Sequence, residues 1–167
     1  MGGAVVFQTK TARDYVGSDS GTYFGVRTSA SDADDQLKAG ATAAVQNGSF
    51  GLIAQLTQRD FSEHQVNGTG SVNPQDGDTQ GGLIKAFWDI SANQSTAISF
   101  ESFEENRDFN LLTDLLGRNA ATVFSSLGFD ESERTRTGLE YNLLRSSGIF
   151  DDLQLLVNLQ NTDSTQR

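Results

Sequence analysis

The sequence contains few residues that could carry out chemistry, and the most distinctive is its single histidine, His64. A neutral imidazole nitrogen can bind a metal such as iron, so His64, between Glu63 and Gln65, is the candidate ligand-binding residue. An ordinary exposed loop histidine is the competing interpretation. The absence of cysteine excludes disulfides, thiolate catalysis and Cys-ligated zinc.

Two acidic clusters, at residues 32–35 and 130–133, raise the question of calcium binding. Neither has the ligand spacing of an EF-hand loop, so solvated loop charge is the simpler account, and we expect no resident metal or prosthetic group. The sequence also contains no Gly-x-Ser-x-Gly nucleophile elbow and no Gly-rich phosphate loop between a strand and a helix. We therefore expect no enzymatic activity.

The overall charge argues against nucleic acid as a partner. The chain of 167 residues has 12 Lys and Arg against 22 Asp and Glu, and it lacks the basic clusters that neutralise phosphates. No apolar run approaches the ~18 residues of a membrane helix, which excludes a helical membrane protein. A membrane β-barrel remains open, because its strands alternate in polarity and keep average hydropathy low.

The secondary structure that must position these residues is predicted from the alternation of apolar and polar residues at every second position. Between residues 81 and 90, every second position from Ile84 to Ile90 is apolar, and the same division recurs at residues 50–59 and 153–160. Weaker alternation of the same kind occurs in the segments between them. The whole pattern predicts an all-β, antiparallel, up-and-down meander. About seven strands are expected, near residues 23–32, 37–46, 50–59, 81–90, 95–107, 135–145 and 153–160.

The turns predict which residues stand opposite one another. Asn47-Gly48 is the preferred type I′ hairpin turn and would pair Gln46 with Ser49. The next hairpin, at residues 91–94, needs an odd-numbered loop if the apolar residues of its two strands are to share a face.

Longer loops are expected at residues 62–79 and 108–133. Within the second, leucines follow helical spacing, which predicts two short helices that start near Asn110 and Asn119 and stop at Gly117 and Gly128.

Alternation alone does not distinguish a soluble β-sandwich from a membrane barrel. The small residues Ala39, Ala41 and Ala43 would fill a sandwich interior poorly but cost little against lipid. Lys85 stands in mid-strand, where facing lipid would cost ~2–4 kcal/mol. We predict that the opposite face lines an aqueous lumen with Gln55, Arg59, Lys85, Asp89 and Glu101.

Two aromatic residues fit the boundary between a membrane and water. Trp88 lies next to a short turn, and Tyr141 occupies a similar place in a later strand. Their amphipathic rings are typical of interfacial anchors. Core packing is the competing interpretation for Trp88.

In order and content, these segments resemble part of a TonB-dependent outer-membrane receptor, nearest to the branch that takes up haem or haemoglobin iron. The most specific part is residues 2–16, with Gly-Gly, small or β-branched residues, Phe, a Thr-Lys pair and an Ala-x-Asp step. These features resemble the last strand of the family's plug and its link to the barrel. Residues 23–27 and 83–90 resemble the start of the first barrel strand and the fourth strand.

The resemblance implies that residues 1–16 end the plug domain and that residues 17–167 form the N-terminal part of an incomplete transmembrane β-barrel. A receptor barrel of about 22 strands at ~10 residues each needs roughly 220 residues, so this chain would supply about a third of the strands. We therefore expect a fragment of a receptor in the outer membrane of a Gram-negative cell.

By resemblance, the intact protein would bind haem or a ferric siderophore as its transported ligand and use energy from the TonB complex, which it would contact through the missing plug. Outer-membrane lipid would be a further partner, and His64 could then bind haem iron. The alternative function is a soluble or surface β-sandwich used for binding or adhesion. An outer-membrane enzyme is the third possibility, but it lacks a catalytic constellation.

Overall fold

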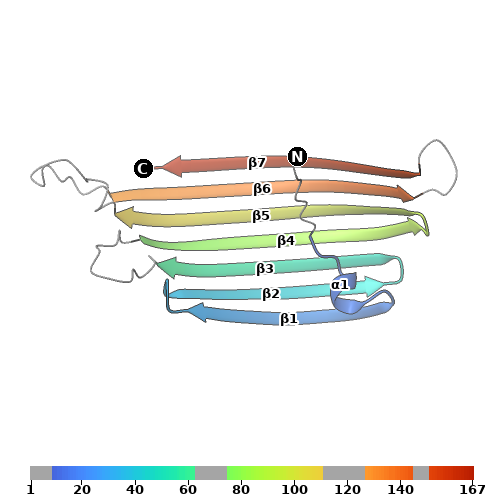
Figure 1. Cartoon of the computed structure of the whole chain (residues 1–167), viewed down its shortest axis with the longest axis horizontal. Helices are drawn as coiled ribbons and strands as arrows, with labels where there is room; N and C mark the ends of the chain where they lie inside the picture. Colours follow the sequence, from blue (N-terminus) through green and yellow to red (C-terminus); the bar gives the residue numbers. More distant parts are fainter. Residues whose placement is uncertain (1–8, 63–74, 111–126, 145–150) are drawn as a thin grey trace, which may run out of the picture.

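The computed structural model describes residues 9–62, 75–110, 127–144 and 151–167. Within them, the chain forms one seven-stranded antiparallel sheet whose strands lie side by side in chain order, after a short helix (Figure 1). The all-β meander predicted from alternation is thereby confirmed. The elements are α1 (Arg13–Val16), β1 (Ser20–Ser31), β2 (Gln36–Asn47), β3 (Phe50–Ser62), β4 (Gln75–Ser91), β5 (Gln94–Asn110), β6 (Leu127–Leu144) and β7 (Asp152–Gln166).

The strands are longer than their alternation suggests. β4, β5 and β6 contain 17, 17 and 18 residues, so both predicted long loops are too long at their ends. Asn110 and Gly128, expected at helix ends, belong to strands β5 and β6 instead, because they pair there with Leu127 and Phe109. The remainder of the two predicted helices lies outside the described residues.

The first tight turn differs from the prediction by one residue in each strand. Asn47 pairs with Phe50, and Gln46 pairs with Gly51 rather than with Ser49. Gly48 has a φ of 56°, whereas Asn47 and Ser49 have negative φ values. A positive φ at the first central residue alone fits a type II′ turn, which accepts glycine there. The pairing register therefore shifts by two residues, so that Ala43 pairs with Ala54 rather than with Leu52. An even shift leaves the same residues on the same face of the sheet.

The hairpin between β4 and β5 confirms the predicted parity. Ala86 pairs with Ile98 and Asp89 pairs with Ser95. Five residues therefore lie between the two members of the last regular pair. Ser91 then pairs with Gln94, which leaves Ile90 as the bulged residue. The odd count is achieved by a β-bulge next to a two-residue turn.

One face of the sheet, the apolar face, carries aliphatic and aromatic residues in cross-strand rows. One row runs through the pairs Phe24–Ala43, Ala54–Ile84 and Thr137–Leu159. From Leu56 to Phe50, the apolar positions extend over ~20 Å at ~3.4 Å per residue, comparable with the ~25 Å band of membrane barrels. Phe24 and Leu159 are 74% and 71% exposed.

This exposure contradicts a β-sandwich. Ala39 and Ala43 are exposed on the same face, not sealed in a dry centre. Within the described part of the chain, the buried apolar residues are Ala12, Ala44, Ile53 and Ala97. A sandwich would bury its inner faces against each other, whereas this chain forms a single open layer, consistent with part of a barrel.

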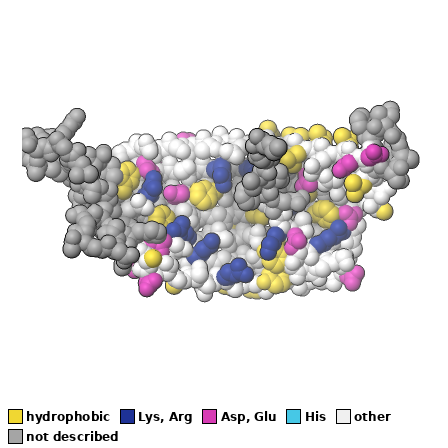
Figure 2. Space-filling model, in the orientation of Figure 1, with side chains coloured by type: hydrophobic (Ala, Val, Ile, Leu, Met, Phe, Trp, Pro, Cys, Tyr) yellow, Lys and Arg dark blue, Asp and Glu magenta, His cyan; other side chains and the backbone are white. Residues whose placement is uncertain are grey.

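The opposite face, the polar face, carries the Lys and Arg residues of the described strands, part of the acidic residues and the helix α1. Figure 2 looks onto this face and shows basic and acidic side chains interspersed across it. In the described residues, no helix is long and apolar enough to cross a membrane.

Candidate functional site

The sheet places the five predicted lumen residues on the polar face. Gln55 pairs with Leu83, which in turn pairs with Glu101, while Lys85 and Asp89 alternate with Leu83 along β4. Arg59 lies on the same face of β3. That this face lines a lumen stays a prediction. The predicted ligand residue His64 lies outside the described residues.

Three of the five residues bind the N-terminal segment, here defined as residues 9–17, which lies on the polar face (Figure 1). The Arg13 guanidinium forms an ion pair with the Asp89 carboxylate. The same guanidinium lies over the ring of Phe87, with 4.6 Å between Cζ and the ring centroid. Both charged side chains are about one-third exposed, so water screens the pair only in part.

Lys85 holds the start of the same segment. Its side chain is 5% exposed, and its Nζ donates a hydrogen bond to the Thr9 hydroxyl at 3.2 Å. A buried ammonium group without polar contacts would be costly. The Thr9 contact therefore favours the docked position of the N-terminal segment.

Gln55 contacts the segment near its other end. Its Nε2 donates to the Tyr15 hydroxyl at 2.9 Å and lies 3.3 Å from the Thr42 hydroxyl. The Tyr15 ring is 5.0 Å from the Tyr23 ring and has the Lys10 ammonium group 5.1 Å from its centroid. Tyr15 is thus contacted at its ring by Tyr23 and Lys10 and at its hydroxyl by Gln55.

Local sequence explains why the segment turns as it does. In the motif Thr11-x-x-Asp14, the Asp14 carboxylate accepts bonds from the Thr11 backbone N–H at 2.6 Å and from its hydroxyl at 3.0 Å. The backbone bond is the main cause that lowers the pKa of Asp14 below its ordinary value of 3.8. Gly17 ends the helix with a φ of 93°, which L side chains rarely adopt.

A small apolar core completes the contact. Ala12 packs against Ala44 and Ile53, and Tyr15 and Val16 pack beside them. Gly51 leaves room here, since a Cβ there would clash with the Gln46 side chain and would lie 3.1 Å from the Ala12 side chain. Sequence reasoning placed residues 1–16 at the end of a plug and Gln55, Lys85 and Asp89 on the lumen face, but it predicted neither the helix α1 nor these pairwise contacts.

Arg59 and Glu101 do not reach the N-terminal segment. Arg59 forms an ion pair of 3.3 Å with the buried carboxylate of Asp34, and its Cζ lies 4.7 Å from the Phe61 ring centroid. Glu101 stands opposite Arg136 in the ladder. These two residues therefore lie on the part of the polar face away from α1.

The two predicted interfacial aromatics occupy one row of the apolar face. Trp88 pairs with Phe50 on one side and with Thr96 on the other, and Thr96 pairs with Tyr141. The row lies beside the turns that join β2 to β3 and β4 to β5. Their role at a membrane boundary stays a prediction.

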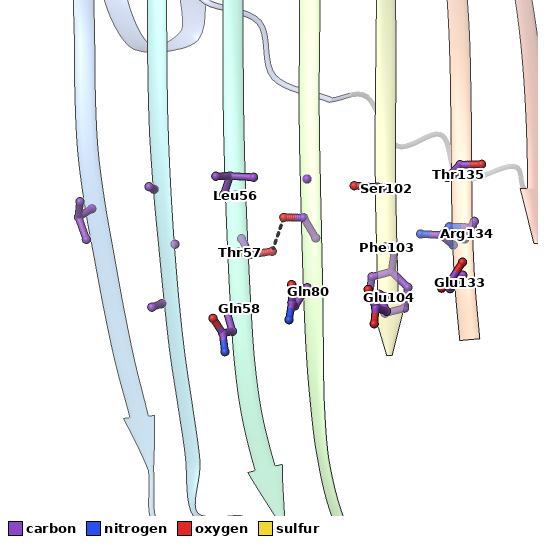
Figure 3. A pocket seen from close by; sticks show the side chains of 16 residues that line it. Leu56, Thr57, Gln58, Gln80, Ser102, Phe103, Glu104, Glu133, Arg134 and Thr135 are labelled. Atoms are coloured by element: carbon purple, nitrogen blue, oxygen red, sulfur yellow. Dashed lines mark hydrogen bonds between the residues drawn. The ribbon is translucent and has the colours of Figure 1, made fainter. Parts of the chain in front are cut away.

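A shallow hollow of about 590 Å³ opens where small residues of the apolar face meet a polar rim (Figure 3). Val26 and Leu56 stand on its apolar side, and Glu104 and Glu133 stand on its polar side. Thr57 lies behind it, with its hydroxyl 3.5 Å from the Gly81 carbonyl. The hollow marks the edge of the apolar rows.

Together, these features define a class of structure: a wall with one face suited to a nonpolar medium and one polar face on which a preceding segment docks. No protein-family model matches the chain. The chain is 28% identical over 180 aligned residues to the "Hemoglobin and hemoglobin-haptoglobin-binding protein" of Haemophilus ducreyi. The alignment covers 96% of this chain and 18% of that relative, so the chain spans less than a fifth of its length.

This similarity supports the receptor family that the sequence resembles. The relative's name describes a binding protein, which fits a non-enzymatic role.

Proposed function

We propose that this chain is part of a TonB-dependent outer-membrane receptor that takes up an iron carrier, with haem or haemoglobin iron as its cargo. The observation that carries this proposal is the apolar face, whose large side chains are exposed along all seven strands. Hydrocarbon tails are the surroundings in which such a face is stable. Similarity to a haemoglobin-binding protein supports the choice of cargo.

In this proposal, residues 1–16 end the plug and link it to the barrel, and residues 17–167 supply the first barrel strands. The polar face lines the lumen, and Trp88 and Tyr141 lie at the membrane boundary. His64 is proposed as a contact for haem iron. The contacts of Arg13, Thr9 and Tyr15 with the wall hold the end of the plug in place.

Growth under iron limitation tests the cargo. Deletion of the gene for the whole receptor should abolish growth on haemoglobin or haem as the sole iron source, and a plasmid copy should restore it. Growth on inorganic iron is the control and should not change. Undiminished growth on both haem sources would contradict the haem cargo.

Fractionation tests the location separately from the cargo. The receptor should sediment with outer membranes and require detergent for release, as expected for a protein surrounded by lipid. Recovery in the soluble fraction would contradict the membrane role, whatever the growth experiment shows.

A further inference from the structure

A second feature of the polar face lies beside the N-terminal segment. A hollow of about 390 Å³ opens between this segment and strands β1, β2 and β3. Its charged lining residues are Lys10, Arg27 and Lys38, and its lining contains no Asp or Glu. This volume is in the range of pockets for small molecules.

Two of the three cations lack a carboxylate partner. Arg27 and Lys38 form no ion pair with any described residue. They lie on neighbouring strands, where Arg27 pairs with Gly40 and Lys38 pairs with Ser29. Because Gly40 has no side chain, the space between the two charged groups stays open.

The neighbouring acidic and basic groups are already engaged elsewhere. Arg59, which pairs with Lys38 in the ladder, directs its guanidinium to Asp34. The positive charge of Lys10 contributes to the lowered pKa of Asp14, and the Asp14 carboxylate already accepts two hydrogen bonds from Thr11. Arg27 and Lys38 therefore keep their positive charge uncompensated at the hollow.

The remaining lining suits oxygen-rich ligands. Thr42 and Ser29 supply hydroxyl groups, while the rings of Tyr15 and Tyr23 line the hollow with aromatic surface. Hydroxyls and cations together can satisfy several anionic oxygens, as charge-assisted hydrogen bonds.

We propose that this hollow binds a small molecule with two or more anionic oxygen groups, carboxylate or phosphate. Lys10 belongs to the N-terminal segment, whereas Arg27 and Lys38 belong to the sheet, so the site is complete only when the segment is docked. By linkage, the ligand then stabilises docking by the same factor by which docking improves affinity. This inference does not depend on the receptor's cargo.

Calorimetry of the whole receptor that contains this chain, purified in detergent micelles at low ionic strength, tests the site with citrate and with inorganic phosphate as probes. Saturable binding of citrate assigns a carboxylate ligand, and saturable binding of phosphate alone assigns a phosphate ligand. Absence of saturable binding for both probes would overturn the proposal.

A matched pair of double variants separates the site from the general charge of the face. Arg27→Gln with Lys38→Gln should weaken binding about tenfold or more, the effect of losing ~1.4 kcal/mol. Arg134→Gln with Arg136→Gln removes the same charge from the same face, but outside the hollow of 390 Å³. This control should change affinity less than about twofold. Equal losses in both double variants would overturn the proposal.

Two further variants keep the test valid if the double variant misfolds. Lys38→Arg retains the charge and should retain binding. Lys10→Gln should weaken binding and should also abolish any slowing by the ligand of amide exchange at Tyr15 and Gly17. A ligand that binds without affecting exchange in this segment would contradict the shared site.

Discussion

Replacing Arg13 by Ala should release the N-terminal segment from the sheet without unfolding the sheet. The substitution removes the ion pair with Asp89 and the contact with the Phe87 ring. A partly exposed ion pair contributes about 0.5–1 kcal/mol, and a cation–π contact of this kind contributes a similar amount. Since Ala is a good helix former, α1 itself loses nothing by the exchange.

The expected loss is therefore about 1–2 kcal/mol of docking free energy, which raises the undocked fraction about 5- to 30-fold. Amide hydrogen exchange measures it directly. The N–H groups of Val16 and Gly17 donate to the carbonyls of Ala12 and Arg13 at 3.0 and 2.9 Å, and they should exchange faster by that factor. Amides within β3 and β4 should keep their rates.

The control variant is Arg107→Ala, which removes a similar pair of contacts elsewhere on the polar face. Arg107 pairs with Asp130 at 2.8 Å and lies 5.8 Å from the Phe109 ring centroid. It should leave exchange in α1 unchanged. If Arg13→Ala also left it unchanged, or if both variants accelerated it equally, the ion pair would not be what holds the segment.

Three other predictions concern the faces, the pH dependence and the linker. Ile84→Arg, on the apolar face, should reduce bilayer insertion by ~2–4 kcal/mol, whereas Leu83→Arg, on the polar face opposite Glu101, should insert normally, as measured by folding into lipid vesicles. Because the pKa of Asp14 is lowered below 3.8, the stabilisation of docking by its carboxylate is present above that value and is lost as pH falls through the folded pKa. Amide exchange in α1, corrected for the intrinsic effect of pH, should therefore accelerate at acidic pH, and Asp14→Asn should remove this acceleration. Gly17→Ala should weaken docking by ~1–2 kcal/mol through strain at a φ of 93°, detectable as faster cleavage of the segment by a protease.

The sequence allowed the faces of the strands to be predicted but not their ends. Alternation marks a strand only where one face is apolar, as from Ile84 to Trp88. Beyond these rows, both faces are polar, and Asp76 stands opposite Asp108 in a ladder that no periodicity indicates. The long loops were overestimated for this reason.

Long-range contacts of the site could not be predicted from spacing. Arg13 and Asp89 are 76 positions apart, as are Thr9 and Lys85. Alternation placed Lys85 and Asp89 on one face, but the docked segment that contacts them becomes visible only in the fold. Glycine shows the same limit, because the need for Gly51 arises from the Gln46 side chain of the neighbouring strand and from the approach of Ala12.

Charge gives an argument about the two faces that does not use hydropathy. All Lys and Arg residues of the described strands lie on the polar face, namely Arg27, Lys38, Arg59, Lys85, Arg107, Arg134 and Arg136. Acids on the apolar face, such as Asp60, Asp78 and Glu133, occur only beyond the apolar rows. Water would impose no such separation on an exposed face, because either charge is well solvated there. A nonpolar medium would impose it, because it excludes both charges from the rows that it covers. The separation therefore supports lipid as the surroundings of this face, on grounds independent of its aliphatic content.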